Sequence, residues 1–290
     1  MSCAVFLLHR VAPGAADDRW GLTVDPHEFA ALLRRLVASG TLVSLPEALE
    51  HLARGGRARV TALTFDDGYA DLLHHAFPLL AELDAPATVF LATRYVEDGT
   101  PFWWEALRWL SSEPRRLPGL AAAWGLPLAA TPEETVDTWC RHFKRLAPAR
   151  RDALLAGLDC PPGVPRALAV AELAHRPRSC LLGCHGHSHT VLTALSAAAV
   201  AAELEHSCRR IAAWSGTAPG ELAFPNGQPD DFGADHLGPM RAVGLRAALT
   251  TVDGLNTPGA DPYRLRRITV RPGQGLAQVE EVLSGAGGGG

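Results

Sequence analysis

Two adjacent carboxylates close a short apolar segment in the first quarter of the chain. Residues 60–68 read Val-Thr-Ala-Leu-Thr-Phe-Asp-Asp-Gly, so Asp66 and Asp67 follow a run of strand-forming residues, and Gly68 permits a sharp turn. Two neighbouring carboxylates repel each other, and a bound cation relieves that repulsion. The pair therefore indicates a metal site, although two aspartates that only cap the following helix and turn would look the same.

Three histidines lie within five residues in the second half of the chain, at His185, His187 and His189. Side chains four residues apart share a face in a helix and also in an extended segment, so His185 and His189 converge in either conformation. His187 joins them only if the segment is extended. Cys184 would point away from His185 in a strand, so we do not count it as a ligand.

Asp67, His185 and His189 together offer one carboxylate and two imidazoles. This donor set suits a catalytic zinc ion, which keeps positions open for water and substrate. Zn²⁺ is therefore the expected ion, with Co²⁺, Ni²⁺, Mn²⁺ or Fe²⁺ as alternatives, and the same donors also describe non-haem iron oxygenases. Asp66 favours hydrolysis, because a carboxylate beside a ligand can take a proton from the attacking water.

The segments that must position these residues alternate between strand-like and helix-like patterns. The alternation predicts an α/β protein with a parallel sheet, and about seven repeats are enough to close it into a distorted (β/α) barrel. An open doubly wound sheet is the second choice. N-capping patterns predict helices that begin near residues 26 and 45. Strands are expected at 3–8, 60–65, 87–93, 180–185, 221–225, 245–250 and 267–270, and further helices at about 69–83, 196–214 and 229–243.

The stretch from about 99 to 178 interrupts this alternation, because it is rich in Leu, Ala and Pro and contains no convincing strand. We predict a helical insertion that lies over or beside the barrel mouth. The expected organisation is a single domain over residues 1–284, followed by a glycine-rich tail at 285–290 that should be disordered.

Composition excludes several classes of partner. The formal net charge is -4, and no basic stripe is present that could neutralise nucleic acid phosphates. No apolar run approaches the roughly 20 residues that a membrane span needs. The apolar run at 4–8 is too short for a secretory signal, so a cytoplasmic location is expected, with reduced cysteines. Oligomeric state has no signature in the sequence.

The motifs Thr-Phe-Asp-Asp-Gly at 64–68 and His-Gly-His-Ser-His at 185–189 together resemble the polysaccharide deacetylase (NodB-homology) family, and in particular its exopolysaccharide and poly-N-acetylglucosamine branch. The resemblance implies a distorted barrel of about seven strands. It also implies that Asp66 is the general base, that Asp67, His185 and His189 hold the metal, and that the reaction hydrolyses an N-acetyl group on an amino sugar. Further likeness at 8–11, 86–90, 102–104 and 265–268 extends it over nearly the whole chain.

The third motif of the family departs from its usual form. Residues 222–227 read Leu-Ala-Phe-Pro-Asn-Gly, where the family often has Arg-Pro-Pro-Tyr-Gly. The resemblance implies that the main-chain N–H of Asn226 helps hold the oxyanion, and that Pro225 lies beside the substrate. Because the donor belongs to the main chain, the change from Tyr to Asn need not remove it.

The arginine that orients the base in the family is replaced by Ala223. Arg267, or else Arg266, in the last predicted strand is the expected substitute, and the alternative is an ordinary charge at a strand end. No histidine follows Leu265 where the family has its general acid, so the sequence does not identify the group that protonates the leaving amine.

Three aromatic residues are candidates for substrate binding. Trp103 and Trp104 could stack on a sugar ring, or they could anchor the insertion to the barrel. Tyr69 follows the Asp-Asp-Gly turn and would either line the cleft or begin the next helix. The expected substrate is a saccharide, a lipid-linked or nucleotide-linked precursor, or a glycosylated metabolite. The alternatives are a deformylase, a hydrolase of non-sugar amides, and a catalytically silent binding homologue.

Overall fold

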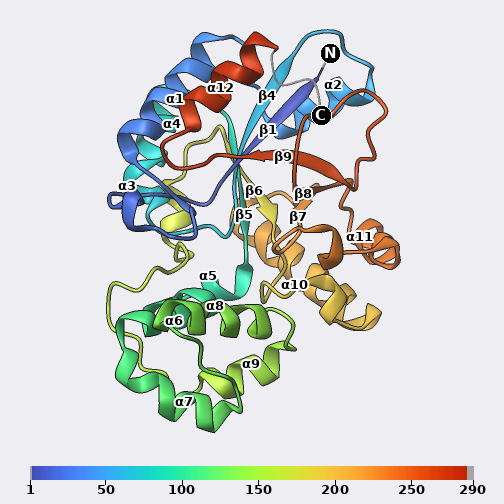
Figure 1. Cartoon of the computed structure of the whole chain (residues 1–290). Helices are drawn as coiled ribbons and strands as arrows, with labels where there is room; N and C mark the ends of the chain where they lie inside the picture. The colour runs from blue at the N-terminus through green and yellow to red at the C-terminus, as the bar shows by residue number, and fades with distance from the viewer. Residues whose placement is uncertain (1, 286–290) are drawn as a thin grey trace.

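The computed structural model describes residues 2–285 and has a closed barrel of seven parallel strands at its centre (Figure 1). The strands follow one another round the barrel in chain order, and the first pairs with the last. The barrel confirms the predicted α/β class and excludes the open sheet. Its strands are β1 (Cys3–Leu8), β4 (Val60–Phe65), β5 (Ala87–Leu91), β6 (Cys180–Cys184), β7 (Glu221–Ala223), β8 (Ala247–Asp253) and β9 (Leu265–Thr269).

The barrel strands read as nearly continuous apolar runs because both of their faces are covered. In β1 all six residues are buried, and alternate positions pack into different clusters. Phe6 and Leu8 pack with the surrounding helices, whereas Cys3 and Val5 pack inside the barrel. Burying one large aliphatic side chain stabilises a fold by about 1.5–3 kcal/mol, so this double burial accounts for much of the barrel's stability.

The two helices predicted from capping patterns begin at the expected residues. α1 (Pro26–Ala38) follows Asp25, whose carboxylate accepts the N–H of His27 at 2.8 Å. α2 (Leu45–Ala53) begins with a capping box between Ser44 and Glu47. Buried residues of α2 pack against the barrel-interior cluster, so this helix covers one end of the barrel. Two further helices flank the barrel: α10 (Ala197–Ser215) and α12 (Gly275–Ser284).

Two predicted helices are broken in the structure. The helix expected up to residue 83 divides into α3 (Leu72–His75) and α4 (Phe77–Glu82). Pro78 causes the break, because it lacks an N–H and its ring clashes with the carbonyl of the preceding turn. The helix expected at 229–243 is helical only at its end, in α11 (Leu237–Ala242), and short 3₁₀ turns precede it.

Helices fill the long segment between β5 and β6. Within the described residues the barrel takes no strand from 99–178, and these helices gather at the bottom of Figure 1, away from both termini. The α-helices here are α5 (Thr93–Asp98), α6 (Trp103–Trp109), α7 (Leu117–Trp124), α8 (Pro132–Phe143) and α9 (Pro148–Leu155).

The remaining elements are short. Strands β2 (Arg10–Val11) and β3 (Thr23–Val24) pair outside the barrel. Among residues 2–285, no helix is both long enough and apolar enough to cross a membrane. Apart from Gly285, the tail expected to be disordered lies outside the described residues. The 3₁₀ helices are η1 (Ala15–Asp17), η2 (Leu110–Ser112), η3 (Pro114–Arg116), η4 (Glu172–His175), η5 (Leu192–Ala194), η6 (Pro229–Asp231) and η7 (Ala234–His236).

Candidate metal and catalytic site

Asp67, His185 and His189, here called the catalytic cluster, meet at the carboxyl ends of the barrel strands. Asp67 follows β4, and both histidines follow β6. The Oδ1 atom of Asp67 lies 3.3 Å from Nε2 of His185 and 3.2 Å from Nε2 of His189. All three side chains are buried. The fold therefore brings the carboxylate oxygen of Asp67 to the imidazole nitrogens of two histidines that lie 118 and 122 residues later in the sequence.

The ring of His185 is held in the orientation that a metal ligand needs. Its Nδ1 lies 2.7 Å from the carbonyl oxygen of Ala223 on the neighbouring strand β7. A carbonyl can only accept, so Nδ1 carries the proton and donates it. Nε2 then presents its lone pair toward Asp67, which is the arrangement in which a metal-binding histidine is fixed by a second hydrogen bond.

Charge states in the catalytic cluster suit a cation. Burial opposes ionisation of Asp67, but the two imidazoles outweigh burial and hold its pKa well below the ordinary value. Burial lowers the pKa of His189, so its ring is neutral at neutral pH. Burial also opposes protonation of His185, yet the charges of Asp66 and Asp67 raise its pKa above the ordinary value. A cation would compete with that proton, so metal affinity should fall as the pH falls.

Unsatisfied atoms support the same assignment. Among the described residues, Oδ1 of Asp67 is buried without a hydrogen-bond partner. Leaving such a group unpaired costs roughly 1–3 kcal/mol, and more when it is charged. A divalent cation would satisfy this oxygen and both Nε2 lone pairs together. The donor set thus fits a divalent metal ion, as predicted, and does not by itself distinguish zinc from the alternatives.

Asp66 is bound by a buried arginine from the last strand. Nη1 and Nη2 of Arg267 donate to the two carboxylate oxygens of Asp66, each at 2.7 Å. The Nε of Arg267 donates to the carbonyl of Thr250 at 2.7 Å, which fixes the guanidinium. Burial alone would raise the pKa of Asp66, but the charge of Arg267 outweighs it and the pKa is lowered. The structure thus places Arg267, not Arg266, where the arginine missing at Ala223 would have acted.

Strained backbone is concentrated at the site. Only four non-glycine residues in the described chain have positive φ, and three of them are site candidates: Asp67 (68°), His189 (53°) and Asn226 (62°). Such conformations cost of order 1–3 kcal/mol each and persist where the surrounding structure imposes them. The fourth, Asp84, is an exposed residue at the end of α4.

Two of these strained residues occupy equivalent turns. The N–H of Gly68 donates to the carbonyl of Asp66 at 2.8 Å, and the N–H of Gly227 donates to the carbonyl of Pro225 at 2.8 Å. A hydrogen bond across one residue of positive φ is a strained γ-turn, and here it redirects the chain directly after β4 and β7. At Gly68 a Cβ would also lie 2.4 Å from a Leu91 methyl group, so glycine is required.

Residues 185–189, here called the His loop, are held in a bent conformation. Gly186 has a φ of 74°, so the segment is not extended, and His187 points away from the catalytic cluster. One carboxylate oxygen of Glu203 on α10 accepts the N–H groups of His187 and Ser188, each at 2.9 Å. Sequence reasoning missed Glu203, because a charged residue in an Ala-rich helix resembles an ordinary surface charge.

A second missed residue supports the His loop from the insertion. Arg151 on α9 is fully buried, and its Nη2 donates to the carbonyl of Ser188 at 2.7 Å. No pattern in the helical insertion distinguishes this arginine from its neighbour Arg150, so only the fold reveals it.

A cavity of about 380 Å³ opens beside the catalytic cluster. Both tryptophans predicted to contact substrate line it, and the insertion reaches over the barrel mouth to supply part of the wall through α8. The lining residues are His9, Trp20, Leu22, Asp66, Asp67, Trp103, Trp104, Cys140, Arg141, Lys144, His185, His189, Asn226 and Thr251.

Two candidate substrate-binding residues lie elsewhere. Tyr69 is fully buried and is not among the residues that line the cavity, so its contact with substrate stays a prediction. Its hydroxyl donates to Glu105 at 2.8 Å and accepts the Nε1–H of Trp104 at 2.7 Å. Pro225 is also buried and outside the lining, within the turn that presents Asn226. Tyr69 therefore positions Trp104, whose ring centroid lies 4.3 Å from that of His189.

His9 lines the cavity but was not among the residues predicted to take part in catalysis. It lies in the segment 8–11, which was noted only for its likeness to the family. It follows directly after β1, which places it at the same rim as Asp66 and Asp67. Burial lowers its pKa and outweighs the opposing charges of these two aspartates, so the ring is neutral at neutral pH. Its position after the first strand could have identified it once a barrel was predicted.

Comparison with known sequences identifies one family. The sequence profile of the family described as polysaccharide deacetylase matches residues 53–118, a span that contains Asp66 and Asp67. No curated protein sequence matches the chain.

Solved structures share the fold over nearly the whole chain. The Streptococcus pyogenes deacetylase PplD in complex with acetate aligns with a TM-score of 0.67 and 16% identity, covering 98% of each chain. IcaB from Ammonifex degensii aligns at 0.64 and 18% identity, covering 97% of each chain. The BpsB deacetylase domain from Bordetella bronchiseptica aligns at 0.57 and 20% identity, covering 92% of this chain and 95% of that one. At such identities the likeness establishes the fold alone.

Proposed function

We propose that this chain, which belongs to the polysaccharide deacetylase family, hydrolyses an N-acetyl group on an amino sugar and releases acetate and a free amine. The observation that carries the proposal is the buried catalytic cluster of Asp67, His185 and His189 with Asp66 directly beside it. A similar fold has been solved for a deacetylase in complex with acetate, the acid that this reaction would release.

Each catalytic role rests on a group at the carboxyl rim. A divalent cation bound by the catalytic cluster would polarise the acetamide carbonyl and acidify the attacking water. Asp66 accepts the proton of that water, and Arg267 keeps the carboxylate ionised and oriented. The N–H of Asn226 has no acceptor among the described residues, which leaves it available to the developing oxyanion.

His9 is the group that we assign to protonation of the leaving amine. The amine must gain a proton as the C–N bond breaks, and Asp66 is held ionised by Arg267. Lys144 is engaged by Asp231 at 2.9 Å, so it is less available than His9. His9 would donate as an imidazolium, after it takes up the proton that Asp66 removes from the attacking water. His9 would thus take the role that the family gives to the absent late histidine.

The cavity walls indicate a sugar that carries a negative group. Trp103 and Trp104 offer aromatic faces, and Nε1 of Trp103 has no hydrogen-bond partner among the described residues. Arg141 stands at the side formed by α8, where it would attract a phosphate or carboxylate, whereas Asp231 pairs with the neighbouring Lys144. This combination supports a phosphate-linked amino sugar precursor as substrate.

Acetate release from a panel of N-acetylhexosamine derivatives tests the proposal. The metal-replete protein should release acetate, and Asp66→Asn should reduce turnover by about 10²- to 10⁴-fold while metal content stays the same. Asp84→Asn is the matched control, because it makes the same change at an exposed carboxylate that does not line the cavity. Full activity of Asp66→Asn would refute its role. Release of formate from N-formyl analogues, without acetate release, would point to the deformylase alternative.

A further inference from the structure

A second group of potential metal ligands lies on the other side of the His loop. Glu97 is in α5, His187 is in the His loop, and His206 is in α10. One ligand atom from each of the three lies within 4.8 Å of the other two. The residues are 19 or more positions apart in the chain, so their convergence does not follow from local sequence.

The geometry of this group resembles that of a metal site more than that of a simple ion pair. Nε2 of His206 lies 3.5 Å from Oε2 of Glu97, at the limit of a hydrogen bond. The ring centroids of His187 and His206 are 4.1 Å apart at an interplanar angle of 47°. Two imidazoles and a carboxylate at this spacing match the donor set of a zinc site with three protein ligands and one water.

The available lone pairs point to the same ligand. Nε2 of His206 is buried and has no hydrogen-bond partner among the described residues. Nδ1 of His187 lies 3.0 Å from the hydroxyl of Thr93, so Nε2 of His187 is the ring nitrogen that could bind a metal ion. Arg210 contacts Oε1 of Glu97, so Oε2 remains directed at His206. Nδ1 of His206 lies 3.5 Å from Nη2 of Arg209, at the limit of a hydrogen bond. Each member thus has one atom near a neighbour outside the group and one atom within 4.8 Å of the other two members.

We propose that Glu97, His187 and His206 form a second binding site for a divalent transition-metal ion such as Zn²⁺, separate from the catalytic cluster. The group lies near the surface, because the side chain of His206 is 37% exposed and that of Glu97 is 21% exposed. The proposal does not depend on the enzymatic activity, since none of its three residues belongs to the catalytic cluster or lines its cavity.

An ion at this site would tie α5 and α10 to the His loop. His187 lies two residues from both His185 and His189, so the ion would restrict the loop that carries the catalytic ligands. The cations of Arg94 and Arg210 lie close by and weaken the attraction for a metal. We therefore expect the catalytic cluster to fill first and the second site to fill at higher metal concentration.

Metal stoichiometry of the full chain tests the proposal. Protein stripped with a chelator is titrated with ZnCl₂, and binding is followed by calorimetry and by metal analysis after gel filtration. The wild type should bind two ions per chain in two separate phases. His206→Asn should bind one ion and keep the tighter phase, whereas Asp67→Asn should lose the tighter phase and keep the weaker one. His27→Ala, which removes an exposed histidine on α1, should still bind two.

A thermal measurement covers the case in which His206→Asn fails to fold. Saturating Zn²⁺ should raise the melting temperature of Asp67→Asn, and adding Glu97→Gln to that variant should remove the rise. Binding of a single ion by the wild type would overturn the proposal, and so would a second ion retained by both His206→Asn and Glu97→Gln. Neither result would affect the assignment of the catalytic cluster.

Discussion

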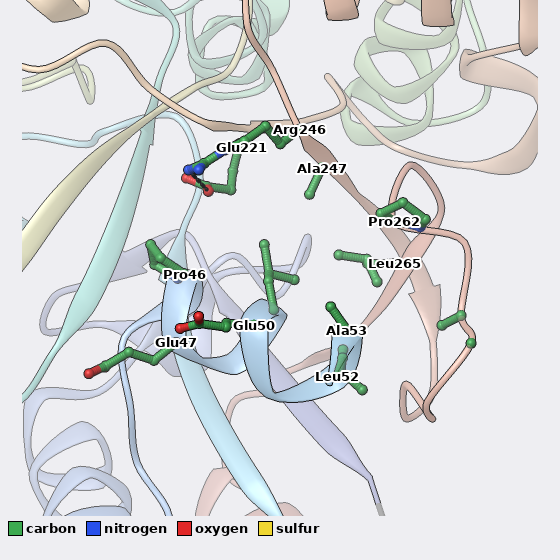
Figure 2. Close-up of a pocket in the computed structure, with 13 residues that line it drawn as sticks. Pro46, Glu47, Glu50, Leu52, Ala53, Glu221, Arg246, Ala247, Pro262 and Leu265 are labelled. Carbon is green, nitrogen blue, oxygen red and sulfur yellow. Dashed lines mark hydrogen bonds and ion pairs between the residues drawn. The ribbon is translucent and has the colours of Figure 1, made fainter. Parts of the chain in front are cut away.

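The two ends of the barrel each hold a cavity, and they differ in chemistry more than in size. The cavity at the amino ends of the strands is the larger, at about 710 Å³, and lies between α2 and the starts of β7, β8 and β9. Figure 2 shows Pro46, Glu50 and Leu52 of α2 facing Arg246, Pro262 and Leu265 across it. The cavity at the carboxyl ends has about 380 Å³.

Convergent polar groups distinguish the smaller cavity. It is lined by the catalytic cluster and by Asp66, which pairs with the buried Arg267, and three of its lining residues have strained backbone. At the amino end, Glu221 meets only Arg246, at 3.4 Å, and that arginine side chain is 75% exposed. Burial raises the pKa of Glu221, but no second buried ligand faces it among the described residues. Cavity volume alone therefore does not locate a reactive site in a barrel.

Replacement of one buried polar side chain at each end of the barrel should give the largest contrast. His189→Ala should lose the tightly bound metal ion and with it all measurable turnover, because two remaining donors hold a catalytic ion poorly. Glu221→Gln, at the amino end, should keep both. Metal analysis and acetate release measured on the same preparations would check this. Equal losses of metal and of acetate release in the two variants would contradict the assignment of the reactive site to the carboxyl end of the barrel.

Replacement of the proposed acid should give the next largest effect. His9→Gln should lower kcat by about 10²- to 10⁴-fold on an N-acetyl sugar, because the leaving amine then lacks a proton donor. An acetyl ester of an acidic phenol needs no such proton, so its hydrolysis should be far less affected. Equal losses on the amide and on the ester would show that His9 does not act as the acid.

The ion pair between Asp66 and Arg267 should set the pH dependence of kcat/KM. Arg267 holds the pKa of Asp66 below its ordinary value, so the base is ionised through the mildly acidic range. Arg267→Lys keeps the charge but loses the bidentate contact, so that pKa should rise and the acidic limb of kcat/KM should move to higher pH. Activity at neutral pH should fall by about 10- to 100-fold. If the acidic limb of kcat/KM does not move in this variant, a group other than Asp66 controls it.

The ion pair also links stability to pH. Because the pKa of folded Asp66 lies below its unfolded value, the pair contributes stability above pH of about 4 and loses it as pH falls further. Denaturant titrations of Arg267→Lys and wild type should therefore converge as the pH falls, and a constant difference would contradict this linkage.

The smallest expected effect concerns the support beneath the cavity wall. Tyr69→Phe removes a hydroxyl that binds both Glu105 and Trp104, at a cost of about 0.5–1.5 kcal/mol in unfolding free energy for each hydrogen bond. Because Trp104 loses its anchor, KM should rise a few-fold while kcat changes little. Chemical denaturation and steady-state kinetics would measure the two effects. A large fall in kcat alone would imply direct contact with the reacting group.

The sequence predicted the barrel well, because its strands are apolar runs whose ends are marked by turn residues. β1 and β4 have the predicted bounds, and the other barrel strands overlap the predicted runs. The break in the helix after Gly68 was not predicted. The helical pattern of side chains continues through Pro78, but proline has no backbone N–H to continue the hydrogen bonding. Local pattern therefore located elements better than it located their interruptions.

The catalytic cluster was accessible from sequence because its residues form dense local motifs. Its supporting residues were not. Glu203 and Arg151 each reach the His loop from a distant helix, and nothing in their local sequence marks them. The buried position of Tyr69 was not predicted for a related reason. Its hydroxyl bonds Glu105 and Trp104 of α6, and local sequence does not reveal that these partners lie next to it.

Anomalous diffraction at the zinc absorption edge from crystals of the metal-replete protein would show whether Asp67, His185 and His189 hold a metal ion. We predict a peak about 2.0–2.2 Å from a carboxylate oxygen of Asp67 and from Nε2 of both His185 and His189. An active preparation whose crystals show no peak at that position would contradict this prediction.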